Sequence, residues 1–275
     1  DWTRQFGTGS SDTAQAVGVN GDLYVAGNTF GALPGQVSAG DSDVFLRKYD
    51  INGNLIWTRQ FGTSSVDFAF RIAVASSSVY VAGVTSGDLP GQASSGGQDA
   101  FVRKYDTAGN EVWTRQFGTS DLDTVHGISV DSSAVYVAGT TFGTFPSQVS
   151  SGDSDAFVRK YDTNGNEIWT RQFGTSSVDF MRSVFVDSSG VYGGGWTFGT
   201  FPGQSSAGGF DAFIRKYDSS GNEVWTRQFG SSSSEFDFAI AADGVGVYVG
   251  GSTEGALPSQ VNSGGQDVYV RKYDT

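Results

Sequence analysis

Five carboxylates recur six residues after the phenylalanine of a repeated Trp-Thr-Arg-Gln-Phe-Gly hexapeptide. They are Asp12, Asp67, Asp123, Asp179 and Glu235. If the repeats closed around one axis, these side chains would form a ring, where like charges raise each other's pKa or attract a hard cation such as Ca²⁺. An Asp ahead of a strand also accepts N–H hydrogen bonds within its own turn. A cation site and a set of turn caps are therefore both open.

Three residues further on, the otherwise similar repeats diverge. The residues there are Gln15, Phe70, His126, Arg182 and Phe238. An amide, two aromatic rings, an imidazole and a guanidinium at equivalent places would suit an asymmetric ligand-binding site, whereas drift at a permissive exposed position would produce the same mixture. Both interpretations stay open.

Trp196 is the only tryptophan outside the hexapeptides. Its flat apolar face and single N–H donor would suit stacking on a pyranose ring. It would equally fill the space beside three consecutive glycines, residues 193–195. We treat it as a candidate ligand-binding residue together with the five divergent positions.

The composition excludes several kinds of chemistry. The chain has no cysteine and one histidine, which excludes zinc–thiolate sites, thiol nucleophiles and a histidine metal cluster. The formal net charge is −12, and 15 of the 17 basic residues fall in repeated motifs. Because neutralising phosphates requires clustered Lys and Arg, we expect no nucleic-acid partner.

No apolar run approaches the roughly 20 residues that cross a bilayer, and the N-terminus lacks the basic and apolar regions of a signal peptide. We therefore expect no membrane span, and we expect any targeting segment to lie outside this chain.

The chain of 275 residues is a tandem repeat, which predicts a single domain over residues 1–275. The hexapeptide opens at a spacing of 55 or 56 residues, at Trp2, Trp57, Trp113, Trp169 and Trp225. Each repeat continues with a Val-Tyr-Val-Ala-Gly-like segment, a loop with one proline, an Asp-Ala-Phe-Val-Arg-Lys-Tyr-Asp-like segment and a Gly-Asn turn.

Alternation of apolar and polar residues predicts four strands in each repeat. In the third repeat they cover residues 125–130, 135–140, 156–161 and 167–173. The Asn164-Gly165 step suits a two-residue type I′ hairpin turn, which needs positive φ at both positions.

Four short strands in a repeat of this length are typical of a propeller blade. We expect the first hexapeptide, residues 2–7, to form an outermost strand. The given sequence ends after the expected third strand of the fifth repeat, residues 268–273. We therefore expect an all-β, five-bladed β-propeller of four-stranded antiparallel blades. Pairing of the N-terminal strand with the C-terminal blade would close the ring.

The Gly-Asn-Glu-Val-Trp-Thr-Arg-Gln-Phe-Gly stretch, the Val-Tyr-Val-Ala-Gly strand and the Asp-Ala-Phe-Val-Arg-Lys-Tyr-Asp strand resemble bacterial SBBP-type propeller repeats across all five repeats. The family name refers to seven blades, from which five repeats depart. The resemblance implies a bacterial, secreted or cell-surface propeller in a family whose activities are largely unassigned.

These observations favour a monomeric, non-catalytic binding or structural scaffold that presents one face to a glycan, an ion or a protein, with no cofactor apart from a possible Ca²⁺. The alternative is a glycosidase-like hydrolase with Asp12, Asp123 and Glu235 at the channel mouth. It would require paired carboxyl groups with divided acid and base roles.

Overall fold

The computed structural model describes residues 1–243 and 245–274, and the chain forms two compact units, Asp1–Val125 and His126–Thr275. The described residues form nineteen strands and no helix. They therefore contain no helix that is long and apolar enough to span a membrane.

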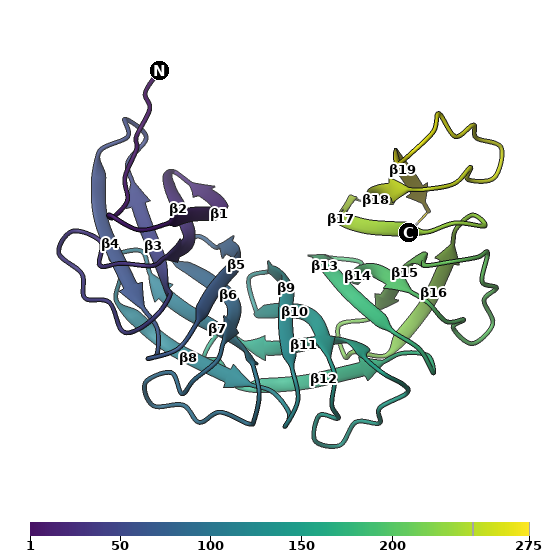
Figure 1. Cartoon of the computed structure of the whole chain (residues 1–275), viewed down its shortest axis with the longest axis horizontal. Helices are drawn as coiled ribbons and strands as arrows, with labels where there is room; N and C mark the ends of the chain where they lie inside the picture. The colour runs from purple at the N-terminus through teal and green to yellow at the C-terminus, as the bar shows by residue number, and fades with distance from the viewer. Residues whose placement is uncertain (244, 275) are drawn as a thin grey trace. The chain divides into compact units, whose positions relative to one another are not determined.

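Consecutive strands form antiparallel sheets in chain order (Figure 1). The first sheet contains β1 (Asp12–Asn20), β2 (Asp22–Thr29), β3 (Asp43–Tyr49) and β4 (Leu55–Phe61). The second contains β5 (Asp67–Val74), β6 (Ser78–Thr85), β7 (Asp99–Asp106) and β8 (Glu111–Phe117).

The remaining sheets belong to the second unit, apart from the first residues of β9. The third sheet contains β9 (Asp123–Val130), β10 (Ala134–Thr141), β11 (Asp155–Asp162) and β12 (Glu167–Phe173). The fourth contains β13 (Asp179–Asp187), β14 (Gly190–Thr197), β15 (Asp211–Tyr217) and β16 (Glu223–Phe229). The fifth contains β17 (Glu235–Asp243), β18 (Gly246–Thr253) and β19 (Asp267–Tyr273).

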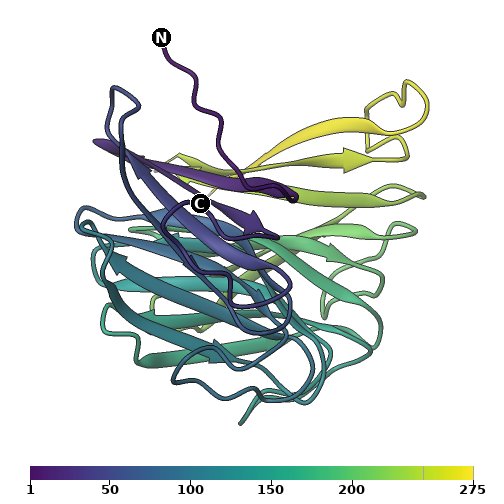
Figure 2. The ribbon, with the colours of Figure 1, turned by 60° about the vertical axis from the view of Figure 1, so that its left-hand side comes forward.

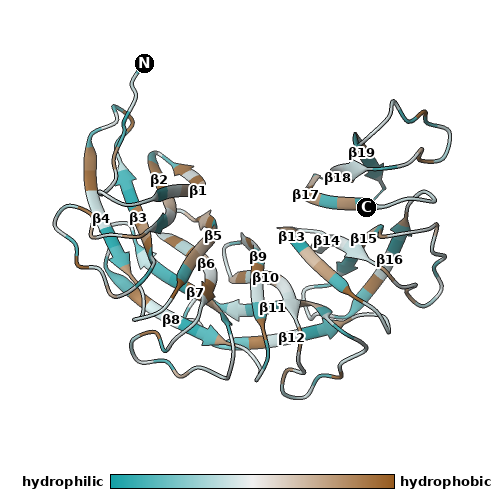
Figure 3. Cartoon of the chain, in the orientation of Figure 1, coloured by the Kyte–Doolittle hydropathy of each residue, from teal (hydrophilic) through white to brown (hydrophobic). Residues whose placement is uncertain are grey.

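The four strands predicted for each complete repeat are confirmed. In the third repeat, β12 covers the predicted residues 167–173, and β9, β10 and β11 extend the predicted ranges by one or two residues at an end. Hydrophobic and hydrophilic bands alternate along the strands in Figure 3. The sheets appear as twisted antiparallel ribbons in Figure 2, as expected for strands of L-residues.

The predicted two-residue type I′ turn is wrong. Only Gly165 of the Asn164-Gly165 step has positive φ, at 80°. Asp162 donates its N–H to Asn166 O over 2.9 Å, and Gly165 donates to Asp162 O over 3.0 Å. The Asp162 carboxylate accepts from the backbone N–H groups of Asn164 and Asn166, each over 2.8 Å. The side chain thus stabilises a three-residue loop with one left-handed glycine.

A β-bulge interrupts the pairing of the first and second strands at the divergent position. The register skips one residue between Ala69 and Arg71, and likewise between Met181 and Ser183. The skipped residues in the four pairings that show this shift are Gln15, Phe70, Arg182 and Phe238. A bulge re-aims the side chain of the extra residue, so these positions tolerate different residue types.

The bulge explains the glycine that ends the Val-Tyr-Val-Ala-Gly segment. A Cβ atom built on Gly83, opposite Ala69, would overlap the carbonyl oxygen of Phe68. Gly195 faces the carbonyl oxygen of Phe180 in the same way. Only glycine allows the two backbones to approach this closely.

The hexapeptide on the fourth strand packs against the next sheet. In the first unit, Trp57 donates its indole N–H to Thr107 O over 3.2 Å, and Arg59 Nε donates to Gly109 O over 2.6 Å. The ring of Phe61 lies edge-on to Phe101, with centroids 5.7 Å apart. Aromatic packing and hydrogen bonds together join neighbouring sheets.

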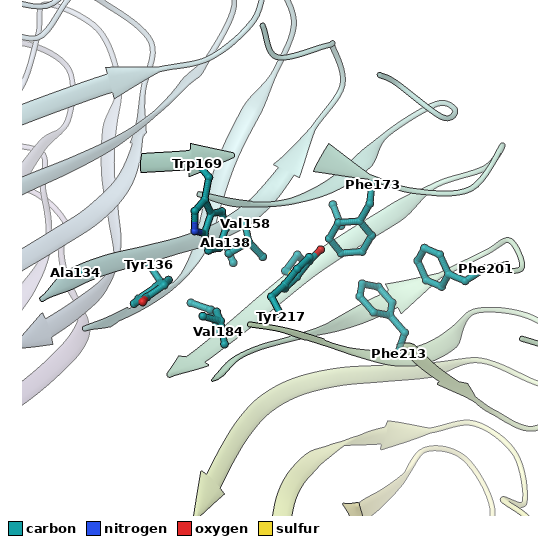
Figure 4. Packing of buried hydrophobic residues seen from close by; sticks show 13 residues of the cluster. Ala134, Tyr136, Ala138, Val158, Trp169, Phe173, Val184, Phe201, Phe213 and Tyr217 are labelled. Carbon is teal, nitrogen blue, oxygen red and sulfur yellow. The ribbon is translucent and has the colours of Figure 1, made fainter. Parts of the chain in front are cut away.

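The core of the second unit is built in the same way. Figure 4 shows Phe173 and Phe213 beside Tyr217, with Phe201 next to Phe213 and Trp169 on the strand above. The centroids of Phe173 and Phe213 are 5.9 Å apart, and those of Phe201 and Phe213 are 5.0 Å apart. The rings of the hexapeptide thus pack against the Arg-Lys-Tyr-Asp strand of the next sheet.

Residues 1–7 do not form the expected N-terminal strand. The segment lies beside the β3–β4 hairpin, where Trp2 stacks on Tyr49 and Phe6 is edge-on to Phe45. Pairing of this segment with β19 stays a prediction.

The glycine opposite the bulge gives a test of this architecture. We expect Gly83→Ala to lower the free energy of unfolding by about 1–3 kcal/mol, because the added methyl group must displace the Phe68 carbonyl. Gly9→Ala is the control, since a Cβ atom there meets nothing within 4 Å. Equal stability of the two variants in urea titrations would contradict this role of Gly83.

Candidate functional site

Four of the six candidate ligand-binding residues form a continuous chain of contacts in the second unit. Arg182 Nη1 lies 3.5 Å from His126 Nδ1, and the Arg182 guanidinium lies over the Trp196 ring, 5.3 Å from its centroid. The rings of Trp196 and Phe238 are 5.9 Å apart in an edge-to-face arrangement. The bulges on β13 and β17 present Arg182 and Phe238 to this cluster.

Further phenylalanines extend this cluster into what we call the aromatic patch. The patch consists of Phe180, Trp196, Phe198, Phe210, Phe236 and Phe238, linked by ring contacts with centroids 5.2–6.5 Å apart. Phe198 is 54% exposed and Phe238 is 47% exposed. Large exposed aromatic rings that touch each other are typical of a binding surface.

Sequence reasoning missed Phe180, Phe198, Phe210 and Phe236 as members of this surface. Phe180, Phe198 and Phe236 have aromatic counterparts in other repeats, whereas Phe210 stands where the other repeats carry serine or glutamine and was a signal that went unused. The available signal was the coincidence of all of these rings with Trp196 in the fourth and fifth repeats.

Trp196 replaces a polar residue that joins neighbouring sheets elsewhere. At the equivalent place, Asn28 Oδ1 accepts the N–H of Ala69 over 2.7 Å, and Thr140 Oγ1 accepts that of Met181 over 3.3 Å. Trp196 instead packs edge-on against Phe236, with centroids 5.2 Å apart. Because Arg182 covers its ring, Trp196 is an inward part of the patch rather than an open sugar platform.

The two remaining candidates, Gln15 and Phe70, belong to the first unit. Gln15 is exposed at the bulge of β1. Phe70 stacks on Phe68 with centroids 6.5 Å apart, and Phe68 contacts Phe30 at 6.4 Å. The first unit therefore carries a smaller aromatic group at the corresponding place.

The repeated carboxylates lie in turn caps. Asp67 Oδ2 accepts the N–H of Thr63 over 2.6 Å and its hydroxyl over 3.0 Å. Glu235 Oε2 accepts the N–H of Ser231 over 2.6 Å, while Oε1 accepts the hydroxyl of Thr253 over 2.6 Å. Asp12, Asp123 and Asp179 accept the corresponding threonine N–H groups.

Nothing in the described part of the chain groups three or more His, Cys, Asp or Glu side chains in a way that could hold a metal ion. The capping hydrogen bonds engage Oδ2 of each of the four aspartates and both oxygens of Glu235. The cation hypothesis stays a prediction.

The pKa values of the capping aspartates shift in different directions. Burial raises the pKa of Asp67 and of Asp179, and hydrogen bonds from threonine oppose it. For Asp12, burial also acts upward, but hydrogen bonds from Thr29 and Thr8 outweigh it and lower the pKa. The pKa values at equivalent positions therefore shift in different directions, because burial and hydrogen bonds are balanced differently at each place.

Asp237 is a carboxyl group that sequence reasoning missed. Asp237 follows Phe236 and precedes Phe238 in the sequence. Its side chain is fully buried, and its Oδ2 has no hydrogen-bond partner. Oδ1 accepts the N–H of Ala239 over 3.1 Å. Burial raises the pKa of Asp237 well above its ordinary value. The signal was compositional, since the equivalent residues are Ala14, Ala69, Val125 and Met181.

We expect Asp237→Ala to raise the free energy of unfolding by about 1–3 kcal/mol at neutral pH, because it removes a buried carboxyl that is only partly hydrogen-bonded. The folded state holds the proton more tightly than the unfolded state. The wild-type protein therefore loses stability as pH rises from the ordinary Asp pKa toward the raised one. The gain from the substitution should shrink at acidic pH.

Denaturant titrations from pH 4 to pH 8 measure this effect, with the exposed Asp153→Asn as the control. A loss of stability on Asp237→Ala at neutral pH would show that the carboxylate has a stabilising partner.

The turn-cap geometry predicts that excess calcium leaves the melting temperature unchanged, while Asp67→Ala lowers it with or without calcium. Differential scanning fluorimetry distinguishes the alternatives. A calcium-dependent rise that disappears in Asp67→Ala would instead assign the carboxylates to a cation site.

No protein-family model matches the chain, so the resemblance to SBBP-type repeats stays an expectation. The regulatory protein FlaEY of Caulobacter vibrioides is 30% identical over 310 residues, which cover 96% of this chain and 32% of FlaEY. This chain thus spans about a third of the length of that relative.

Among solved structures, the WD40 domain of Neurospora crassa Pan2 matches with a TM-score of 0.54 and 11% identity, over 96% of this chain and 63% of that one. An apocarotenoid oxygenase of Synechocystis matches with a TM-score of 0.45 and 12% identity, over 84% of this chain and 52% of that one. The chain is therefore all-β, with repeated four-stranded antiparallel sheets like those of a WD40 propeller.

Proposed function

We propose that this chain is a non-catalytic scaffold that binds a protein ligand through the aromatic patch. The observation that carries the proposal is the continuous set of half-exposed rings around Trp196, with Arg182 and His126 at its border. Aromatic rings and arginine supply much of the energy of protein interfaces. The similarity to a regulatory protein and to a WD40 domain is consistent with such a role.

A protein ligand suits the patch better than a glycan. The ring of Trp196 is contacted by Phe180, Phe236 and Phe238, and Arg182 lies over it. The most exposed rings are phenylalanines, which carry no polar group for sugar hydroxyls. Apolar and aromatic side chains of a peptide would pack between such rings without that requirement.

The absence of catalysis is part of the same proposal. The alternative hydrolase would use Asp12, Asp123 and Glu235, whose oxygens accept hydrogen bonds from Thr8, Thr119 and Ser231 in their own turns. Glycoside hydrolysis needs a paired acid and base, whereas each of these carboxylates caps its own turn.

We also infer that the five sheets are the blades of one closed, monomeric propeller over residues 1–275. Residues 1–7 would supply the fourth strand of the fifth sheet, which has three strands among the described residues. Closure would protect the free edge of β19 from pairing with other chains. Secretion or display at a bacterial cell surface, which the SBBP resemblance implies, completes the proposal.

Exchanges between repeats give matched variants for the binding test. Phe238→Gln introduces the residue that the first repeat has at the equivalent position, Gln15. Trp196→Asn introduces the equivalent of Asn28, whose side chain accepts the N–H of Ala69 in the neighbouring sheet. We expect each variant to fold and to weaken binding at least about tenfold, because each removes a central ring of the patch. Phe142→Ser is the control, since Phe142 is 44% exposed and is not part of the patch.

The measurement selects binders from a displayed peptide library on the wild-type protein and compares their dissociation constants for the four proteins by calorimetry. A glycan array is run in parallel. Peptides that bind all four proteins equally would contradict the proposed surface. Glycan binding that Trp196→Asn removes would instead make this a lectin.

A further inference from the structure

The buried carboxyl group of Asp237 fits a space that the neighbouring sheet leaves for it. Asp237 belongs to β17 of the fifth sheet, which packs against β13 and β14 of the fourth. A Cβ atom built on Gly194 of β14 would overlap Asp237 Oδ2, and Ser183 Oγ of β13 lies 3.0 Å from the same point. An alanine in place of Gly194 would therefore collide with the carboxyl group.

The glycine and the aspartate form a matched pair of changes between repeats. The first three repeats have alanine at the place of Gly194, and the first four have an apolar residue at the place of Asp237. In the first unit, the corresponding Ala26 and Ala69 are both fully buried in one cluster. Gly194 thus makes the room that the Asp237 side chain occupies.

The surroundings of Asp237 suit a neutral carboxyl group. The side chain is fully buried, Oδ1 accepts the N–H of Ala239 over 3.1 Å, and Oδ2 has no hydrogen-bond partner. An ionised carboxylate without water or a donor at one oxygen costs far more free energy than the neutral acid. Ionisation therefore favours an arrangement in which water reaches Asp237.

Two tyrosines of β19 are in electrostatic contact with Asp237. Burial raises the pKa of Tyr269, and the charges of Asp237 and Glu235 add to the rise. Burial also raises the pKa of Tyr273 to about 12, with Asp237 as one contributor. Both phenols stay neutral while Asp237 titrates, and both oxygens of Glu235 are engaged in its turn cap. These groups therefore do not balance the charge of an ionised Asp237.

The remaining strands around Asp237 place glycines beside it. Gly194 lies against it on β14, and Gly251 is opposite it on β18. On β13 the charged residue beside this junction is Arg182, whose guanidinium lies over the Trp196 ring. An ionised Asp237 would thus have no donor for Oδ2 among the described residues.

The strands that enclose Asp237 also carry the aromatic patch. Phe236 and Phe238 precede and follow it on β17, and Phe238 is the bulged residue. Trp196 lies two residues beyond Gly194 on β14. Its ring contacts those of Phe236 and Phe238, with centroids 5.2 Å and 5.9 Å apart. A movement of β17 away from β14 therefore separates rings of the patch.

We propose that Asp237 is a pH-sensitive switch that controls ligand binding by the aromatic patch. While its carboxyl group is neutral, the junction of β17 with β13 and β14 stays closed and holds the rings of the patch together. Ionisation draws water to the carboxylate, moves β17 away from Gly194 and disperses the rings. The patch therefore binds its ligand at acidic pH and releases it as pH rises. This inference rests on the proposed function of the patch and adds its regulation.

The binding test uses a peptide without titratable side chains, selected on the wild-type protein from the displayed library at pH 5. We expect its dissociation constant to rise at least about tenfold between pH 5 and pH 9, because binding is linked to the proton on Asp237. Asp237→Asn has no proton to lose, so its dissociation constant should change by less than about twofold. An equal rise for the wild type and Asp237→Asn would overturn the proposal.

His126 requires a control of its own, because its imidazole is a second titratable group at the border of the patch. His126→Gln introduces the residue of the first repeat, Gln15. We expect this variant to keep the pH dependence of the wild type. Loss of the pH dependence in His126→Gln would assign the switch to His126 and overturn the role of Asp237.

A second readout needs no ligand. The indole N–H signal of Trp196 in an NMR spectrum is identified by its absence from Trp196→Asn. We expect this signal to shift with pH in the wild type and to stay fixed in Asp237→Asn. A fixed signal in the wild type from pH 5 to pH 9 would overturn the switch. If the signal shifts but no peptide is selected, the proposed function fails while the conformational change stands.

The matched pair of residues tests the junction itself. Gly194→Ala alone should lower the melting temperature, because the added methyl group overlaps the Asp237 carboxyl group. In the Asp237→Ala background the same change should be tolerated, because it recreates the Ala26 and Ala69 combination of the first unit. The double variant should also bind the peptide without pH dependence. Equal destabilisation by Gly194→Ala in both backgrounds would overturn the proposed junction.

Discussion

The contact of a buried arginine with a phenylalanine of the preceding hexapeptide holds this architecture together. The guanidinium of Arg103 lies 3.8 Å from the ring centroid of Phe61, and that of Arg215 lies 3.9 Å from Phe173. A desolvated pair of this kind contributes about 2 kcal/mol. Arg103 also pairs with Glu111 of its own hairpin over 3.2 Å. Each such arginine thus joins its own hairpin to the last strand of the preceding sheet. A single sheet therefore cannot bury these arginines and phenylalanines by itself.

The same dependence explains why the strands, but not the site, follow from the sequence. Period-2 alternation and the hexapeptide spacing place β12 at residues 167–173. This works because the alternation of apolar and polar residues along a strand reflects which of its faces is buried. The prediction for the turn at Asn164-Gly165 was wrong because the Asp162 side chain accepts the backbone N–H groups of Asn164 and Asn166 and stabilises a different loop. The ring contacts of Trp196 with Phe236 join different sheets, and no local pattern encodes that distance.

The bulge reconciles the two interpretations of the divergent position. Gly83 or Gly195 across the strand pair allows its backbone geometry, while the bulge directs the side chain away from the regular strand pairing. Residues as different as Gln15 and Arg182 are therefore compatible with one backbone. The position that tolerates different residue types is therefore also a place where one repeat can acquire a different chemistry, as Arg182 does over the ring of Trp196.

The aromatic patch replaces interactions that stabilise the equivalent places in other repeats. Where Asn28 hydrogen-bonds to the N–H of Ala69, the fourth repeat places Trp196 instead, and the fifth places Asp237 where Ala69 stands. Asp237 is buried with one oxygen unpaired, at a cost of about 1–3 kcal/mol. Folding alone would favour the alanine that two other repeats carry. Two residues that folding alone does not favour thus belong to the aromatic patch or lie next to it in the sequence, which is consistent with the proposed binding surface.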